Sequence, residues 1–177
     1  SYLQLNIQNN NTGTAASSDL VATSNNGNES VNFVNLGING GGNTSTGQLG
    51  GANTAYLYST GNDFVIGNGT NNAELRFFTT ASSTYAERMR IDGPTGNVAI
   101  GSTSFDGTHP EKLLINAGTT TSNNLIKATG SYNGLLKTST INSSSGTSAS
   151  ADFVAFNNAG NILNAGINSS GYTLGGI

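Results

Sequence analysis

The sequence predicts an all-β fold, and three observations lead to this prediction. Apolar residues gather in short clusters, such as Tyr56-Leu57-Tyr58 and Phe64-Val65-Ile66, instead of recurring at helical spacing. Asn, Gly, Ser and Thr fill the stretches between the clusters, as they do in turns. Helix-favouring residues occur together only in the short run from Tyr85 to Met89, which we interpret as the approach to a strand. We therefore expect many short strands joined by turns.

The composition predicts a chain that shares its core with identical copies. Hydrophobic residues other than glycine make up only 34% of the chain, and charged residues 8%, against about 25% charged residues in typical domains. Disorder usually combines low hydrophobicity with high net charge, and the formal charge here is only −3. Ordering each residue costs about 1–2 kcal/mol of backbone entropy, which so few apolar residues hardly offset within one chain. We therefore expect an obligate oligomer.

Residue types that are absent or scarce exclude several kinds of site and partner. The chain has no cysteine, so disulfides and thiolate metal sites are excluded. No segment approaches the roughly 18 consecutive apolar residues of a membrane span, so we expect no membrane insertion. Six basic and nine acidic residues, without a basic cluster, argue against a nucleic-acid partner.

Short apolar or alternating runs predict the individual strands. They lie at Tyr2–Ile7, Tyr56–Tyr58, Leu75–Phe77, Met89–Ile91, Val98–Ile100, Leu113–Ile115 and Leu125–Lys127. Asn and Gly tolerate the positive φ that tight hairpin turns require, so Asn-Gly pairs predict turns. These pairs are Asn26-Gly27, Asn39-Gly40, Asn68-Gly69 and Asn133-Gly134.

The stretch "ERMRIDGPTGNVAIG" predicts a well-defined hairpin. Charged and apolar residues alternate from Arg88 to Ile91, and an apolar run returns at Val98–Ile100. Between them, Pro94 presets φ for the second position of a turn and Gly96 supplies conformational freedom after it. We expect Met89 and Ile91 to enter a shared core while the arginines meet acids such as Glu87 or Asp92 on the other face.

The chain repeats part of its own sequence. "GTAASSDLVATSNNGN" (Gly13–Asn28) aligns with "GTSASADFVAFNNAGN" (Gly146–Asn161), each with one acid, Asp19 or Asp152. After a four-residue deletion in the second copy, "FVNLGIN" aligns with "ILNAGIN". We expect both copies to follow the same backbone path, with the extra residues around Glu29–Asn32 in a loop.

These observations predict three divisions of the chain. Residues 1–54 form a first β-rich copy, residues 55–133 a central hairpin module, and residues 134–177 a truncated second copy. We expect a stretch resembling "NTAYLYSTGND" to follow the second copy in the parent protein. Tandem units completed by their neighbours along an axis are typical of elongated assemblies.

The central passage resembles bacteriophage tail fibres and related virion appendages. In that family an E-R-M-R-I-D strand, a Gly-Asn turn and an apolar V-x-I-G run recur, followed by P-x-E-K-L and another strand. The corresponding residues here are Glu87–Asp92, Gly96-Asn97, Val98–Gly101 and His109–Ile115, in which Glu111 directly follows Pro110. The stretch "AYLYSTGNDFVIGNGT" (Ala55–Thr70) is also similar to this family.

The resemblance implies a structural function. Such passages belong to β-rich, elongated homotrimers, intertwined or packed around a threefold axis, and often precede an intramolecular chaperone domain. The implied function is to position a receptor-binding tip for host attachment on the virion surface. The implied partners are copies of the chain, other virion proteins and host surface glycans. The resemblance assigns no catalytic residues.

We expect no enzyme, and no catalytic, cofactor-binding or metal-binding residues. His109, the only histidine, precedes Pro110 and is interpreted as a linker residue; the alternative is an ion bound where three copies meet on an axis. The chain lacks a G-x-S-x-G motif and cysteine for nucleophilic catalysis. It also lacks the Gly-Lys pair of a phosphate-binding loop, so the glycine-rich stretch from Gly40 to Gly51 is interpreted as close backbone approach or a flexible loop.

Three acids need separate consideration, since some phage appendages cleave glycans with paired carboxylates. Each has an arginine nearby in the sequence, and cross-strand ion pairs explain them without catalysis. The acids are Glu74, Glu87 and Asp92, and the arginines are Arg76, Arg88 and Arg90. A glycan-cleaving cleft is also usually lined by aromatic residues, and the chain has no Trp.

Two further hypotheses remain beside the virion fibre. One is a glycan-binding adhesin module of a phage or bacterial surface protein, with exposed tyrosines and Asn side chains on the glycan. The candidate tyrosines are Tyr56, Tyr58, Tyr85 and Tyr172. The other is the stalk of a bacterial surface adhesin. Six Asn-x-Ser/Thr sequences match the glycosylation pattern, and we attribute them to chance in so Asn-rich a chain.

Overall fold

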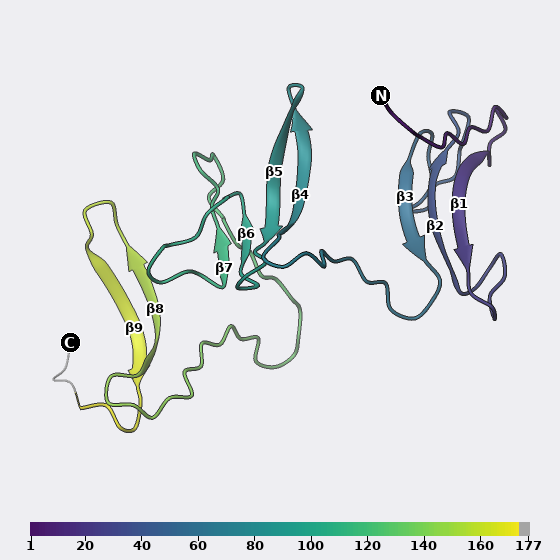
Figure 1. The fold of residues 1–177 in the computed structure, drawn as a ribbon. Helices are drawn as coiled ribbons and strands as arrows, with labels where there is room; N and C mark the ends of the chain where they lie inside the picture. Colours follow the sequence, from purple (N-terminus) through teal and green to yellow (C-terminus); the bar gives the residue numbers. More distant parts are fainter. Residues whose placement is uncertain (174–177) are drawn as a thin grey trace. The chain divides into compact units, whose positions relative to one another are not determined.

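The structure, a computed structural model, describes residues 1–173 (Figure 1). Within this range the chain forms nine β-strands and no helix, which confirms the predicted all-β class. The described residues therefore contain no helix that is long and apolar enough to cross a membrane. The strands are β1 (Ser17–Thr23), β2 (Phe33–Asn39), β3 (Ala55–Ser59), β4 (Leu75–Ala81), β5 (Thr84–Ile91), β6 (Val98–Ile100), β7 (Leu113–Ile115), β8 (Ser150–Phe156) and β9 (Ile162–Asn168).

The strands form three separate sheets: β1-β2-β3, β4-β5-β6-β7 and β8-β9, here named sheets A, B and C. The chain divides into two compact units, Ser1–Thr120 and Thr121–Ile177, so sheets A and B belong to the first and sheet C to the second. Because β3 pairs with β2, sheet A continues across the division expected between residues 54 and 55.

Sheet A is an antiparallel meander with β2 in its centre. On β2 the buried residues are Phe33, Asn35, Gly37 and Asn39, whereas Leu36 and Ile38 on the opposite face are exposed. This alternation is the reverse of an ordinary half-buried strand, which turns its apolar residues inward. The polar face is buried within the chain, whereas the apolar face is largely exposed, with Leu5 and Ile7 beside it.

Sheet B contains an antiparallel hairpin, β4–β5, extended by β6 and then by the parallel strand β7. The β4–β5 turn consists of Ser82 and Ser83, both with positive φ (50° and 67°). Positive φ at both central residues is characteristic of a type I′ turn, whose backbone twist matches that of the flanking strands. Asn-Gly is the usual residue pair in such a turn. The register shifts between Phe77 and Phe78, so that Arg88 forms a β-bulge in β5.

The β5–β6 hairpin turns where the sequence predicted it. Asp92 N–H donates to Asn97 O at 2.9 Å, and Gly96 N–H donates to Asp92 O at 2.9 Å. The Asp92 carboxylate accepts hydrogen bonds from the backbone N–H and hydroxyl of Thr95, and Gly96 has a φ of 67°. Asn97, which is 1% exposed, accepts a hydrogen bond from Lys112 Nζ at 2.8 Å, just before β7. Val98–Ile100 and Leu113–Ile115 are confirmed as strands.

Sheet C has the same pairing as the first hairpin of sheet A. Asp19 lies opposite Gly37 in β1–β2, and Asp152 lies opposite Gly166 in β8–β9. Ser24 N–H donates to Asn32 O at the tip of the first hairpin, as Asn157 N–H does to Asn161 O at the tip of the second. The four additional residues of the first copy therefore lie in this loop. They are Asn28–Val31, one position earlier than the sequence alignment suggested.

Two predicted strands are wrong. Tyr2–Ile7 and Leu125–Lys127 have no strand structure, although Tyr2–Ile7 alternates and Leu125–Lys127 begins with an apolar pair. A strand requires a partner for its backbone groups as well as a suitable pattern, and nothing pairs with these segments within residues 1–173. Conversely, β1, β2, β8 and β9 were missing from the predicted strands, because their apolar residues are adjacent or interrupted by Asn and Gly.

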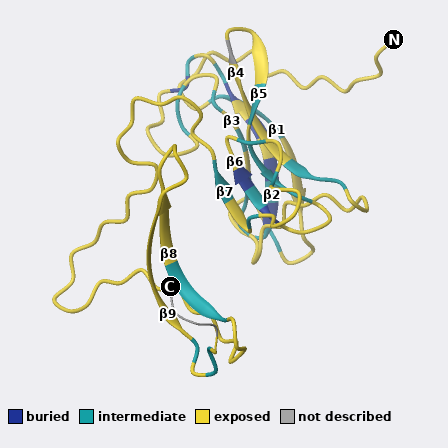
Figure 2. Cartoon of the chain, turned by 90° about the vertical axis from the view of Figure 1, so that its left-hand side faces the viewer, coloured by how far each residue is buried: buried dark blue, intermediate teal, exposed yellow. Residues whose placement is uncertain are grey.

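Little apolar surface is buried within the chain (Figure 2). Among the described residues, Phe33 and Ala99 are the only buried hydrophobic residues, whereas Asn35, Asn39, Asn43 and Asn97 are buried polar ones. Many asparagines also form local turns, in which Oδ1 accepts from the N–H two residues on. Asn28, Asn43, Asn68 and Asn142 do so, all within Asn-x-Ser/Thr sequences. Turn formation thus explains why Asn stands at these four positions.

Candidate functional site

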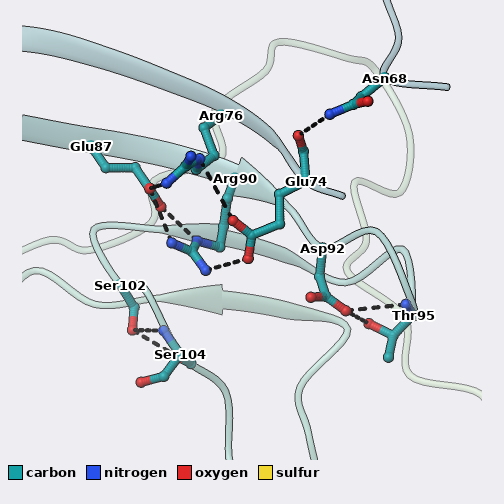
Figure 3. A network of polar contacts seen from close by, with 9 residues as sticks. All are labelled: Asn68, Glu74, Arg76, Glu87, Arg90, Asp92, Thr95, Ser102 and Ser104. Carbon is teal, nitrogen blue, oxygen red and sulfur yellow. Dashed lines mark hydrogen bonds and ion pairs between the residues drawn. The ribbon is translucent and has the colours of Figure 1, made fainter. Parts of the chain in front are cut away.

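The strongest cluster of charged side chains lies on β4–β5, where Arg90 joins two acids (Figure 3). Its Nε and Nη2 donate to the two carboxylate oxygens of Glu87 at 2.6 and 3.0 Å, and its Nη1 donates to Glu74 at 2.5 Å. Arg76 lies farther from the same acids, 3.6 Å from Glu74 and 3.8 Å from Glu87. The network neutralises both glutamates across the strand pair.

The bulge at Arg88 explains the composition of this network. In a regular strand, residues three apart point to opposite faces. The extra residue in β5 places Glu87 and Arg90 on the same face, within bidentate contact. Arg88 itself donates from Nε to Thr79 Oγ1 at 2.8 Å. The expected contact with acids is therefore confirmed for Arg90 and wrong for Arg88, because the bulge separates the two arginines.

The environment of Glu87 does not suit the proton donor of a glycosidase. Hydrogen bonds from Arg90 lower the pKa of Glu87 despite its partial burial, and the charges of Arg90 and Arg76 act in the same direction. A glycosidase needs one carboxyl whose pKa is raised, so that it can donate a proton. Asp92, the third acid considered, is bonded within the β5–β6 turn. The three acids thus have structural partners.

Beside the network lies a hollow of about 440 Å³, lined by Arg76, Phe78, Tyr85 and Glu87. Phe78 and Tyr85 contact each other edge to face, with ring centroids 5.2 Å apart and an interplanar angle of 80°. The two residues are 62% and 77% exposed. Exposed aromatic rings beside charged hydrogen-bonding groups provide both stacking and polar contacts for a polar, ring-shaped ligand.

A second polar cluster surrounds Asp19 on sheet A. Asp19 Oδ1 accepts hydrogen bonds from Asn35 Nδ2 at 2.8 Å and from the Tyr56 hydroxyl at 2.7 Å, and its Oδ2 accepts one from the Ser17 hydroxyl. Gly37 lies between Asp19 and Tyr56, and a Cβ at this position would collide with both side chains. The glycine therefore allows a contact between the two outer strands of the sheet.

Hydrogen bonding decides the charge state of this cluster. Partial burial raises the pKa of Asp19, but the hydrogen bonds from Ser17, Tyr56 and Asn35 outweigh it, and the pKa lies below its ordinary value. Burial and the hydrogen bond to Asp19 raise the pKa of Tyr56. Asp19 is thus an ionised acceptor that connects β1 to β3. The sequence indicated this residue only as the single acid of each repeat copy.

The remaining residues singled out in the sequence lie apart from these clusters. His109 is exposed and donates its backbone N–H to Asp106 Oδ1 at 2.6 Å; this bond and that from Thr108 lower the pKa of Asp106. Tyr58 and Tyr172 are half-buried, and Tyr58 contacts Phe33 edge to face. Within residues 1–173, no three His, Asp or Glu side chains lie close enough together to hold a metal ion.

No protein-family model matches the chain, and no curated protein is significantly similar to it.

Proposed function

We propose that this chain is a structural segment of a homotrimeric, elongated virion appendage such as a phage tail fibre. In this proposal it positions a receptor-binding tip for host attachment and has no enzymatic function. The observation that carries the proposal is that two sheets each have an apolar face that remains partly exposed in the described chain. Shared burial of such faces is the ordinary way in which an oligomer of marginal chains becomes stable.

The apolar face of sheet B consists of two rows that cross all four strands. The rows are Leu75, Ile91, Val98 and Leu113, and Phe77, Met89, Ile100 and Ile115. Phe77, Ile100 and Leu113 are between 42% and 58% exposed. At about 25 cal/mol for each Å² of apolar surface removed from water, covering these rows would contribute several kcal/mol for each copy.

Sheet A has a similar row, and Leu5 and Ile7 of the N-terminal segment line a hollow together with two of its leucines. Leu20, Leu36 and Leu57 lie opposite one another on β1, β2 and β3, and each is more than half exposed. An uninterrupted leucine row across three strands is the kind of patch that marks an interface. Both sheets therefore favour packing between copies over a monomer.

The remaining parts of the proposal are supported by the sequence. The repeated hairpins, β1–β2 and β8–β9, are consistent with units arranged along a fibre. The resemblance of residues 55–70 and 87–115 to virion appendages favours the virion surface as location and other virion proteins as partners.

Light scattering of the purified chain tests the proposal. We expect a particle with three times the 17.9 kDa mass of the chain, and electron microscopy of longer parent fragments should show narrow rods. A stable folded monomer at micromolar concentration would contradict the trimer. A globular trimer would be consistent with a core shared between copies but would contradict the elongated fibre.

The hollow on β4–β5 favours a second candidate, a glycan-binding adhesin module. Its exposed aromatic pair, Phe78 and Tyr85, lies beside Arg76 and Glu87, which could bond to sugar hydroxyls. Binding of the chain to a glycan array should then be lost on Tyr85→Ala and kept on Tyr132→Ala, an exposed tyrosine outside all three sheets. No binding by the wild-type chain would reject this candidate.

A further inference from the structure

The free edge of β9 has the features of a site for a third strand. The hairpins β1–β2 and β8–β9 agree in their flanking hydrogen bonds as well as in register. Gly40 N–H donates to Ala16 O, as Ser169 N–H donates to Ala149 O, both at 2.8 Å. Beyond them, Thr44 N–H donates to Thr14 O at 3.1 Å, and Thr173 N–H donates to Thr147 O at the same distance. The two hairpins are therefore equivalent up to the last described residue.

In the first hairpin, β3 covers the edge of β2. Thr60 N–H donates to Phe33 O at 2.9 Å, and Asn39 N–H donates to Thr54 O at 3.0 Å, one at each end of the pairing. Every second residue of β2 is consequently bonded to β3, and the residues between them to β1. Four of the seven residues of β2 are buried, whereas all seven of β9 are exposed. Within residues 1–173 no strand pairs with the second edge of β9.

The residues of β2 that allow β3 to bind have counterparts in β9. Asn164 corresponds to Asn35, and Gly166 corresponds to Gly37. The Ser150 hydroxyl donates to Asp152, as Ser17 does to Asp19, and a Cβ on Gly166 would again collide with the carboxylate opposite. In sheet A the ring of Tyr56 occupies the space above Gly37, and its hydroxyl donates to the carboxylate of Asp19. In sheet C no tyrosine hydroxyl bonds to Asp152 within the described residues.

We propose that the free edge of β9 binds an extended peptide strand with the Ala-Tyr-Leu-Tyr pattern of β3. The strand lies antiparallel to β9, its first tyrosine faces Gly166, and the tyrosine hydroxyl donates to Asp152. β9 is thus a receptor for a strand of defined sequence, and Asp152 and Gly166 determine its register. This inference does not depend on the virion proposal, since it follows from the comparison of the two hairpins alone.

The equivalence also identifies which backbone groups bind the strand. The β2 residues that face β3 correspond to Ile162, Asn164, Gly166 and Asn168, whose N–H groups face the free edge. The N–H groups of Leu163, Ala165 and Ile167 face β8 and are already paired. Binding should therefore change the hydrogen exchange of the first set and leave the second set unchanged.

Residue-resolved hydrogen exchange tests the proposal on the full chain. The probe is a synthetic peptide with the sequence of residues 53–61, NTAYLYSTG. We expect it to protect the edge-facing amides of β9 and to bind about tenfold more tightly than the same peptide with Phe in place of Tyr56, since a hydrogen bond to a charged acceptor is lost. Asp152→Ala should reduce the difference between the two peptides to less than about twofold.

Internal controls keep the test independent of folding. Protection of Leu163, Ala165 and Ile167 shows that the β8–β9 hairpin is intact in each variant. Glu29→Ala, in the loop of the other hairpin, should leave peptide binding unchanged. Protection confined to β2 would mean that the peptide only replaces β3, and would overturn the proposal. Equal binding of both peptides, or protection of β9 by rising protein concentration without peptide, would overturn it as well.

Discussion

Asp19 on β1 lies directly opposite Gly37 on β2, and its carboxylate occupies space that a side chain at position 37 would need. The missing side chain lets Tyr56 on β3 reach across β2 and donate to Asp19 at 2.7 Å. A single glycine in the central strand thus makes possible a hydrogen bond between the two edge strands. In a sheet with so little buried apolar surface, such polar connections contribute much of the specificity of pairing.

Gly37→Ala is expected to destabilise sheet A. The new Cβ would collide with Asp19 and with the ring of Tyr56, and displacing them costs about 1–3 kcal/mol. Hydrogen exchange of the β2 and β3 amides measures the loss. Gly47→Ala is the matched control, because nothing lies within 4 Å of the corresponding Cβ. Equal effects of the two substitutions would show that the Asp19–Tyr56 contact does not stabilise the sheet.

The stability of sheet A should depend on pH in the acidic range. The folded-state pKa of Asp19 lies below its ordinary value, so its contribution is complete above the unfolded pKa of about 3.9. It is lost as the pH falls through the lower folded pKa. Exchange protection of β2, measured from about pH 5 downward, should decrease in this window. Asp19→Asn should flatten the profile, and an unchanged slope in that variant would assign the effect to other groups.

The sequence predicted well where a strand is bounded by turn residues. Val98–Ile100 follows a Gly-Asn turn, and Leu113–Ile115 follows Pro110; both were predicted with the observed limits. Tyr2–Ile7 was wrong because pairing depends on distant residues that alternation does not reveal. The sequence predicted the charged cluster as cross-strand ion pairs. It did not predict the bulge at Arg88, because a bulge depends on how β5 pairs with β4. No local pattern could therefore tell Arg88 from Arg90.

The turn residues Ser82 and Ser83 provide a stabilisation test. Both have positive φ, which costs a residue with a side chain more than it costs glycine. Replacing the pair by Asn-Gly should raise the stability of the β4–β5 hairpin by about 0.5–1 kcal/mol, seen as slower amide exchange in β5. Replacing it by Ala-Ala keeps the strain and should not stabilise. Slower exchange in both variants would contradict this explanation.

Arg90 and Arg88 should differ strongly on substitution by Gln. The Arg90 side chain is 13% exposed and is the main partner of Glu74 and Glu87, so its loss leaves two partly buried acids with weaker neutralisation. We expect Arg90→Gln to cost about 1–3 kcal/mol of unfolding free energy. Arg88 is exposed, so Arg88→Gln should cost at most about 0.5 kcal/mol. Thermal unfolding followed by circular dichroism compares them, and equal costs would contradict the importance of the network.

Ile100→Asp tests the shared core directly. Ile100 lies in the apolar row with Met89 and Ile115, and it is 42% exposed in the single chain. In the single chain an Asp at this position would stay in contact with water, whereas in a trimer it buries an unpaired carboxylate at a cost of several kcal/mol in each copy. Ile91 is a less clear choice, since it is already half-buried within the chain.

Light scattering of Ile100→Asp should consequently show loss of the trimer, and circular dichroism should show the β signal falling with it, because the separate chain buries little apolar surface. Val65→Asp is the control: Val65 is 86% exposed and lies outside the sheets, so the trimer should persist. If Ile100→Asp remained trimeric, the apolar face of sheet B would not be the interface between copies. The leucine row of sheet A, tested by Leu36→Asp, would then be the remaining candidate, because its three leucines lie side by side across the sheet and are each more than half exposed.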